Sequence, residues 1–144
     1  MGDTKEIYDN YRNLEIGPDL DRALETQAAS FLYVAELAVQ ADTEFERIRD
    51  YLGQLTAKVD GDIREKALSE GRKLTEGGIS GEIDRNADII KTKVALLNLR
   101  RNRDILKALK ESWYMRKDCL IQRCIKERAE MESFRASSSS VKEA

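Results

Sequence analysis

The chain has 144 residues, of which 36% are charged and 41% hydrophobic, and its net charge is −2. Histidine is absent, which removes the commonest general base and the commonest metal ligand. One proline and 6% aromatic residues favour amphipathic helices over a sheet, so we predict an all-α protein. No nucleophile, base and orienting group can be assembled from these residues, and we expect no enzymatic activity, no metal and no cofactor.

Two features of the sequence bear on the compartment. The only cysteines, Cys119 and Cys124, have neither CxxC spacing nor the number needed for a disulfide framework, and we expect reduced thiols that pack. No apolar run reaches membrane length and the N-terminus lacks a signal-type stretch. These features favour a cytoplasmic protein without a membrane partner.

The first eighteen residues lack a sustained apolar period. We interpret residues 1–18 as a flexible or conditionally ordered leader, in which Tyr8 and Tyr11 are candidates for a short docking arm. Pro18 and Asp19 then form a helix-start signal, since proline presets φ and acids favour the first turn.

A long amphipathic helix is predicted from Asp19 to Ser69. Apolar or small residues recur there in steps of three, four or seven, from Leu20 to Ile63. Gly53 and Gly61 are the points at which this helix would bend or divide. One apolar face along such a length requires a long packing partner.

Four glycines predict a hinge or loop over residues 70–81, after which Ser80 is a candidate cap for a second helix. The second helix carries two adjoining apolar stripes, which predict contacts both with its hairpin partner and with another subunit. One stripe is Ile83, Ala87, Ile90, Val94, Leu97, Ile105, Ala108 and Met115. The other is Leu96, Leu99, Leu106, Leu109 and Trp113.

The predicted architecture is therefore a helical hairpin that assembles into a homo-oligomer. We expect residues 19–135 to form one helical oligomerisation domain and residues 136–144 to form a disordered polar tail. We expect the oligomerisation contacts at seven apolar residues: Phe31, Leu52, Leu55, Leu97, Leu106, Leu109 and Trp113.

The small net charge hides a strong asymmetry. Residues 1–70 hold 8 basic and 16 acidic residues, a net charge of −8, whereas residues 71–144 hold 17 and 11, a net charge of +6. The densest basic stretch, residues 85–117, has 10 basic and 3 acidic residues. Such segregation indicates that one surface binds anions or pairs with an acidic partner.

Two sets of basic residues are candidate phosphate contacts. The first lies at the end of the first helix and in the loop, where the alternative is pairing with nearby acids. The second recurs in helical steps, where the alternative is pairing with a neighbouring subunit. The first set is Arg64, Lys66, Arg72 and Lys73. The second set is Lys93, Arg100, Arg103, Lys107 and Lys110.

The order of these features resembles the UvsY family of phage recombination mediators. The likeness begins at DLDRALETQAA (residues 19–29) and continues through Ile63-Arg64-Glu65-Lys66, which looks like the family's basic motif for single-stranded DNA. Lys73-Leu74-Thr75-Glu76 is similar to the family's entry to its second half. ALKESWYMRKDCLIQ (residues 108–122) is similar to its closing helix, so the resemblance covers roughly residues 19–125.

The resemblance implies a ring-shaped homo-oligomer, a hexamer or heptamer, that binds single-stranded DNA. It also implies contact with a single-strand-binding protein and help in loading a RecA-like recombinase onto the strand. Two other readings of the residues stay open: a coiled-coil scaffold in which basic and acidic helices pair between copies, and a helical adaptor that binds an acidic protein. The scaffold would not retain DNA, and the adaptor would be a monomer or dimer with an exposed leucine stripe.

Overall fold

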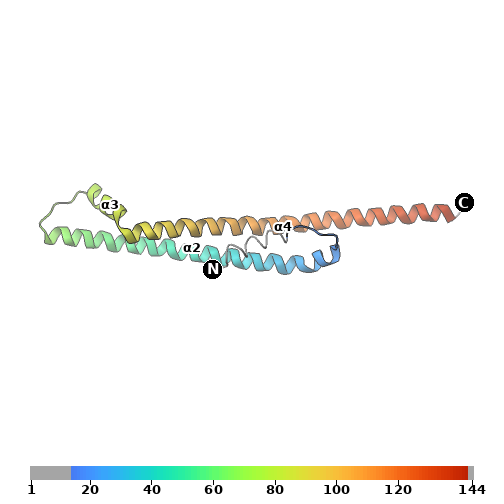
Figure 1. The fold of residues 1–144 in the computed structure, drawn as a ribbon, viewed down its shortest axis with the longest axis horizontal. Coiled ribbons are helices and arrows are strands. Elements are labelled where there is room, and N and C mark those ends of the chain that lie inside the picture. The colour runs from blue at the N-terminus through green and yellow to red at the C-terminus, as the bar shows by residue number, and fades with distance from the viewer. Residues whose placement is uncertain (1–13, 143–144) are drawn as a thin grey trace. The chain divides into compact units, whose positions relative to one another are not determined.

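The computed structural model describes residues 14–142, which are almost entirely helical (Figure 1). Three helices follow one another: α2 (Leu20–Ser69), α3 (Glu76–Arg85) and α4 (Ala87–Lys142). No strand occurs between residues 14 and 142, so the all-α prediction is confirmed for this part of the chain. The described residues form two compact units, one from residues 14–37 with 106–142 and the other from residues 38–105. Tyr8 and Tyr11 lie outside the described residues.

Helix α2 begins where its start signal is. The Arg22 N–H donates to Asp19 Oδ1 at 3.0 Å, so Asp19 is the N-cap and the predicted start is confirmed. The helix then passes through Gly53 and Gly61 without interruption, and the alternative of a divided helix is wrong. A lone glycine costs a helix only about 1 kcal/mol, which the packing of the apolar face offsets.

The glycine-rich segment after α2 is partly helical. Gly71 ends α2 with φ 64°, and the Arg72 N–H donates to Ala67 O at 2.9 Å, which is the hydrogen bond of a Schellman turn. Thr75 then caps α3 by accepting the Gly78 N–H at 3.1 Å. The prediction of a loop over residues 70–81 is therefore wrong from Glu76 onward, because the Thr75 cap and the burial of Ile79 stabilise a helix despite its glycines.

Helix α4 starts later and ends later than predicted. Ser80 lies inside α3, and the cap of α4 is Asn86, whose Oδ1 accepts the N–H groups of Asp88 at 3.0 Å and Ile89 at 3.1 Å. The predicted disordered tail is wrong for residues 136–142, which are helical. There the serine hydroxyls donate to carbonyls one turn back, as Ser139 does to Arg135 O at 3.0 Å, which keeps them compatible with a helix.

Each unit has its own core. Val34, Trp113 and Leu120 are at most 1% exposed in the first unit, and Ile89 is fully buried in the second. The two stripes of α4 have different surroundings. Buried residues of one stripe are Leu99 in the second unit and Leu106, Leu109 and Trp113 in the first. Exposed residues of the other stripe include Ile90, Val94, Leu97 and Ile105 in the second unit and Met115 in the first.

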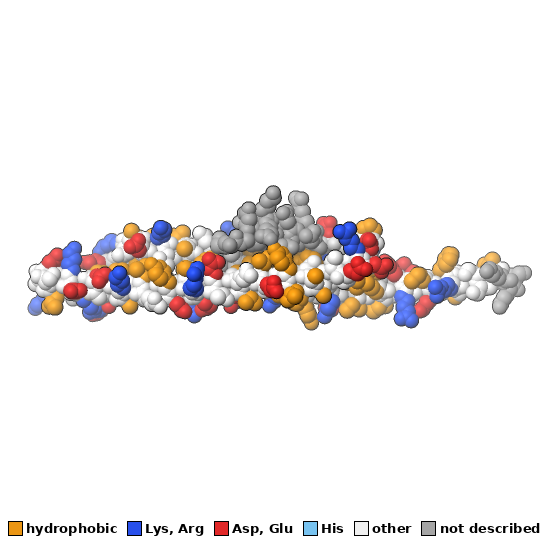
Figure 2. All heavy atoms as spheres, turned by 90° about the horizontal axis from the view of Figure 1, so that it is seen from below, with side chains coloured by type: hydrophobic (Ala, Val, Ile, Leu, Met, Phe, Trp, Pro, Cys, Tyr) orange, Lys and Arg blue, Asp and Glu red, His pale blue; other side chains and the backbone are white. Residues whose placement is uncertain are grey.

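The charge asymmetry along the sequence does not produce a large patch of one sign on the face seen in Figure 2. Acidic and basic side chains alternate there with hydrophobic ones. Cations and anions from different helices lie close together, as Lys93 and Asp84 do at 3.1 Å. On this face, a polyanion would therefore meet only local groupings of cations.

Candidate nucleic-acid interface

A groove in the second unit brings two predicted DNA contacts together. Lys93 and Arg100 lie seven residues apart on α4 and therefore on the same side of the helix. Both line a groove of about 300 Å³, whose other lining residues are Phe45, Leu96 and Leu97. The Asn86 cap fixes where α4 begins and hence where these cations lie along it. The groove is therefore lined by apolar side chains and by two cations.

Arg103 packs against Phe45, one of the residues that line this groove. Its guanidinium stacks over the Phe45 ring at 4.2 Å and donates twice to Asp104 Oδ1 at 3.0 Å. Only 18% of its side chain is exposed, so its main contacts are within the chain. Asp104 is also 4.0 Å from Arg100, a long pairing that leaves the Arg100 guanidinium mostly unoccupied. Arg103 therefore supports the groove, and Arg100 is the more available cation.

Lys93 has one partner, which is exposed. Its Nζ donates to Asp84 Oδ1 at 3.1 Å, and about half of the lysine side chain and more than half of the aspartate remain in contact with solvent. Exposed ion pairs of this kind contribute about 0–1 kcal/mol. A phosphate oxygen can therefore replace Asp84 at small cost.

The first basic set behaves differently, because Arg64 is occupied. Its Nε donates to Asp60 Oδ1 at 3.0 Å, and its two terminal nitrogens donate to the two Glu76 oxygens at 3.0 and 2.9 Å. Hydrogen bonding to Arg64 lowers the pKa of the Glu76 carboxyl, and the same bonds raise the pKa of Arg64. Of the two alternatives for Arg64, the structure has the acid pairing, which ties α2 to the start of α3.

The other members of this set are more open. Arg72 lies 3.8 Å from Glu70 and 3.5 Å from Glu82, both long contacts. Lys66 and Lys73 are exposed and make no ion pair with any described residue. Lys66 and Lys73 are thus the members of this set whose charge is free for a phosphate.

Cations of the first unit include two that the site prediction missed. Lys107 is exposed and Lys110 is half-buried. Arg116, at 7% exposed, donates to Leu14 O at 3.0 Å and Gln27 Oε1 at 2.6 Å, and burial lowers its pKa. Arg123 donates to Gly17 O at 2.8 Å. These two arginines hold residues 14–17 against α4. The spacing of Arg116 with Trp113 and Leu120 places Arg116 on the buried face, and this spacing was the sequence signal that could have identified it.

The residues expected at subunit contacts fall into three groups. Leu106, Leu109 and Trp113 are buried in the core of their own unit, which leaves them almost no surface for another subunit, so the structure differs from the prediction here. Their spacing serves the intrachain partner α2 instead. The half-buried members are Phe31, Leu52 and Leu55, and the exposed one is Leu97.

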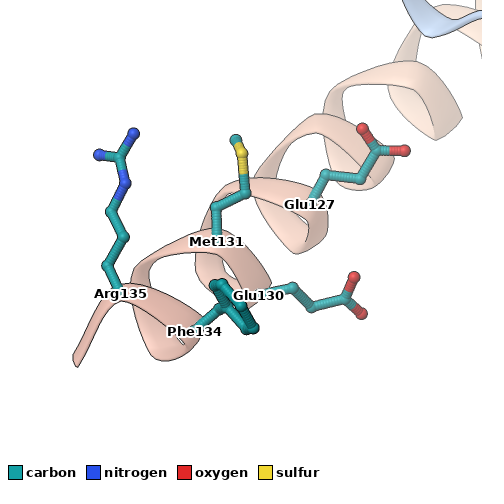
Figure 3. Close-up of a pocket in the computed structure, with 5 residues that line it drawn as sticks. All are labelled: Glu127, Glu130, Met131, Phe134 and Arg135. Carbon is teal, nitrogen blue, oxygen red and sulfur yellow. The ribbon is translucent and has the colours of Figure 1, made fainter. Parts of the chain in front are cut away.

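Other grooves fit a phosphate less well. Near the end of α4, Met131 and Phe134 line a shallow groove of about 450 Å³ with Glu127, Glu130 and Arg135, all from a single helix (Figure 3). Two acids against one cation make it unfavourable for DNA. In the first unit, a groove of about 360 Å³ beside Phe31 and Tyr114 has Lys117 as its one charged lining residue. The groove at Lys93 and Arg100 has two cations and no acid among its lining residues.

Comparison with protein families, curated proteins and solved structures finds no match for this chain. Among residues 14–142, no helix has the length and apolar character needed to cross a membrane. The same residues contain no group of three or more acidic or cysteine side chains placed to hold a metal ion.

Proposed function

We propose that this protein is a recombination mediator, which binds single-stranded DNA as a homo-oligomer and promotes loading of a RecA-like recombinase onto strands covered by single-strand-binding protein. The observation that carries the proposal is the groove at Lys93 and Arg100, with its apolar floor. The resemblance to the UvsY family supports the recombinase and the single-strand-binding protein as partners. Cytoplasm, of the host if the gene is a phage gene, is the expected compartment.

The groove suits a single strand because both parts of a nucleotide find a matching surface. The backbone phosphates approach Lys93 and Arg100, displacing exposed carboxylates that hold them weakly. An unstacked base covers Leu96 and Leu97, which a paired base inside a duplex cannot do. Lys66 and Lys73, whose charges are free, supply further contacts to the backbone.

Assembly supplies the affinity that one groove lacks. Two cations give only a weak, salt-sensitive site, but several copies acting on one strand bind with high effective concentration. We propose that each chain forms a helical hairpin and that the hairpins close into a ring of six or seven. A mediator needs no catalytic group, since its work is to hold and release DNA.

The test is fluorescence anisotropy of a labelled single-stranded oligonucleotide across a salt series. Lys93→Glu/Arg100→Glu is compared with Lys126→Glu/Arg128→Glu, which changes the net charge equally outside the groove. Each lost phosphate contact lowers the slope of log affinity against log salt by about 0.7 for a single strand, so the groove variant should lose at least about 1.4. The control should keep the slope. Equal losses in both variants, or none in either, would show that the groove does not bind DNA.

A scaffold protein without DNA binding is the rival function, favoured by the exposed apolar residues of α4. It predicts an oligomer that ignores the oligonucleotide at every salt concentration. Stimulation of recombinase-driven strand exchange on strands coated with single-strand-binding protein separates the two functions. Wild-type protein should stimulate the exchange, and the groove variant should not.

A further inference from the structure

The side of α4 that faces away from α2 in the second unit is apolar along its length. Ile90, Val94 and Leu97 are 47%, 54% and 64% exposed, and the stripe ends with exposed Arg101 and Ile105. Steps of four, three, four and four residues place all five on one side of the helix. Exposed apolar side chains in a continuous row, unlike scattered ones, mark an interaction surface.

The outward side of α2 in the same unit carries a row of residues with the same spacing, but these residues are polar or small. Asp50, Gln54, Ala57, Gly61 and Glu65 are all exposed and follow one another in steps of four, three, four and four. A Cβ added at Gly61 would meet nothing within 4 Å, so the middle of this face is open and lacks bulky side chains. Each row spans 16 residues, about 22 Å along its helix.

Charges at the two faces are complementary. On α4, Lys91 and Arg101 make no ion pair with any residue from 14 to 142, and on α2 the same is true of Asp50 and Glu65. Residues 87–105 hold 5 basic and 2 acidic residues, a net charge of +3, whereas residues 38–69 hold 5 and 7, a net charge of −2. Unpaired cations thus lie beside the apolar face, and unpaired acids lie at the ends of the open one.

We propose that the outward face of α4 in one copy binds the outward face of α2 in the next. Ile90 and Val94 then cover the open surface around Gly61, and the unpaired cations meet the unpaired carboxylates. A symmetric contact of α4 with α4 would instead place Lys91 and Arg101 of one copy against the same cations of the other copy. Because the two faces differ, the contact is heterologous, and its repetition closes into a ring or runs on as a filament.

This inference rests on the oligomeric part of the proposed function and not on its DNA-binding part. Lys91 and Lys93 are two residues apart and lie on different sides of α4, so the interface and the groove use different cations. Mass measured without DNA therefore tests the interface alone. Failure of the groove variant to bind DNA leaves that measurement unaffected.

The first experiment is light scattering with size-exclusion chromatography on wild-type protein, Val94→Glu and the control Leu32→Glu. Leu32 is an aliphatic residue with similar exposure, 59%, outside the second unit. Wild type and Leu32→Glu should be oligomers, and Val94→Glu should have at most twice the mass of one chain, with helix content unchanged by circular dichroism. A wild-type monomer, or a Val94→Glu oligomer of wild-type mass, would overturn the proposal.

A charge exchange then tests the pairing of the two faces. Lys91→Glu/Arg101→Glu makes both faces acidic, and Asp50→Lys/Glu65→Lys makes both basic, so each variant alone should fall to small species. Mixed in equal amounts, every contact between the two variants again joins opposite charges, and large oligomers should return. If either variant alone assembles like wild type, or if the mixture stays small, the contact between α4 and α2 is refuted.

Discussion

Replacing Leu120 by alanine should destabilise the first unit severely. Leu120 is 1% exposed on the face of α4 that packs within this unit, whereas the next residue, Ile121, is 46% exposed. Truncation of a fully buried leucine to alanine costs about 2–5 kcal/mol, the lost transfer free energy plus the cavity. Ile121→Ala removes a side chain that is only half buried and should cost about 1 kcal/mol.

The assay is unfolding in guanidinium chloride followed by the fluorescence of Trp113, the only tryptophan, which is buried in the same unit. With a slope of roughly 4 kcal/mol per molar, a 3 kcal/mol loss lowers the midpoint by about 0.7 M. All variants must be compared at one protein concentration, because assembly adds to apparent stability. Equal midpoint shifts for Leu120→Ala and Ile121→Ala would refute the assignment of the buried face.

Three further predictions concern the turn region. Gly71→Ala should lower the free energy of unfolding by about 1 kcal/mol in the same assay, because φ 64° is strained for a residue with a Cβ. Asn86→Ala should cost about 1 kcal/mol by removing the cap of α4, and Asn86→Asp should restore it. Because Arg64 lowers the pKa of Glu76 in the folded state, the stabilisation by this pair is present at neutral pH and is lost as the pH falls through the folded pKa. Thermal melts from pH 7 to pH 3 should show wild type above Glu76→Gln at pH 7 and the difference vanishing in acid; a constant difference would contradict the pairing.

Sequence reasoning located α2 well because its signals are local. Asp19 caps a helix through its own side chain and a backbone N–H three residues away, which needs no tertiary information. The period of the apolar residues likewise placed Leu99 and Trp113 on one face, and both are buried. The period alone does not show whether these residues are buried against α2 or against another subunit, because that depends on how the chain turns back.

The turn region was harder to predict because its helix contradicts residue propensity. Glycines at 77, 78 and 81 indicate a loop, yet the Thr75 cap and the buried Ile79 stabilise α3. Arg64 illustrates the consequence for the site: its main partner, Glu76, lies twelve residues away across the turn. A prediction that treats residues 70–81 as a loop cannot place that carboxylate, and so acid pairing and phosphate contact stay equal alternatives for Arg64.

Helix α4 carries more cations than its ion pairs within the described chain use. Within the second unit, Arg103 packs over Phe45, Lys93 and Arg100 line the groove, and Arg101 lies beside exposed apolar residues. In the proposed assembly these cations have separate roles in support, DNA contact and subunit contact. Each subunit added through the outward faces would bring one more groove, so assembly and DNA affinity would rise together although no cation serves both. A variant that assembles normally but loses DNA, Lys93→Glu/Arg100→Glu, is therefore expected, whereas Val94→Glu should lose both the oligomer and the affinity that several grooves provide.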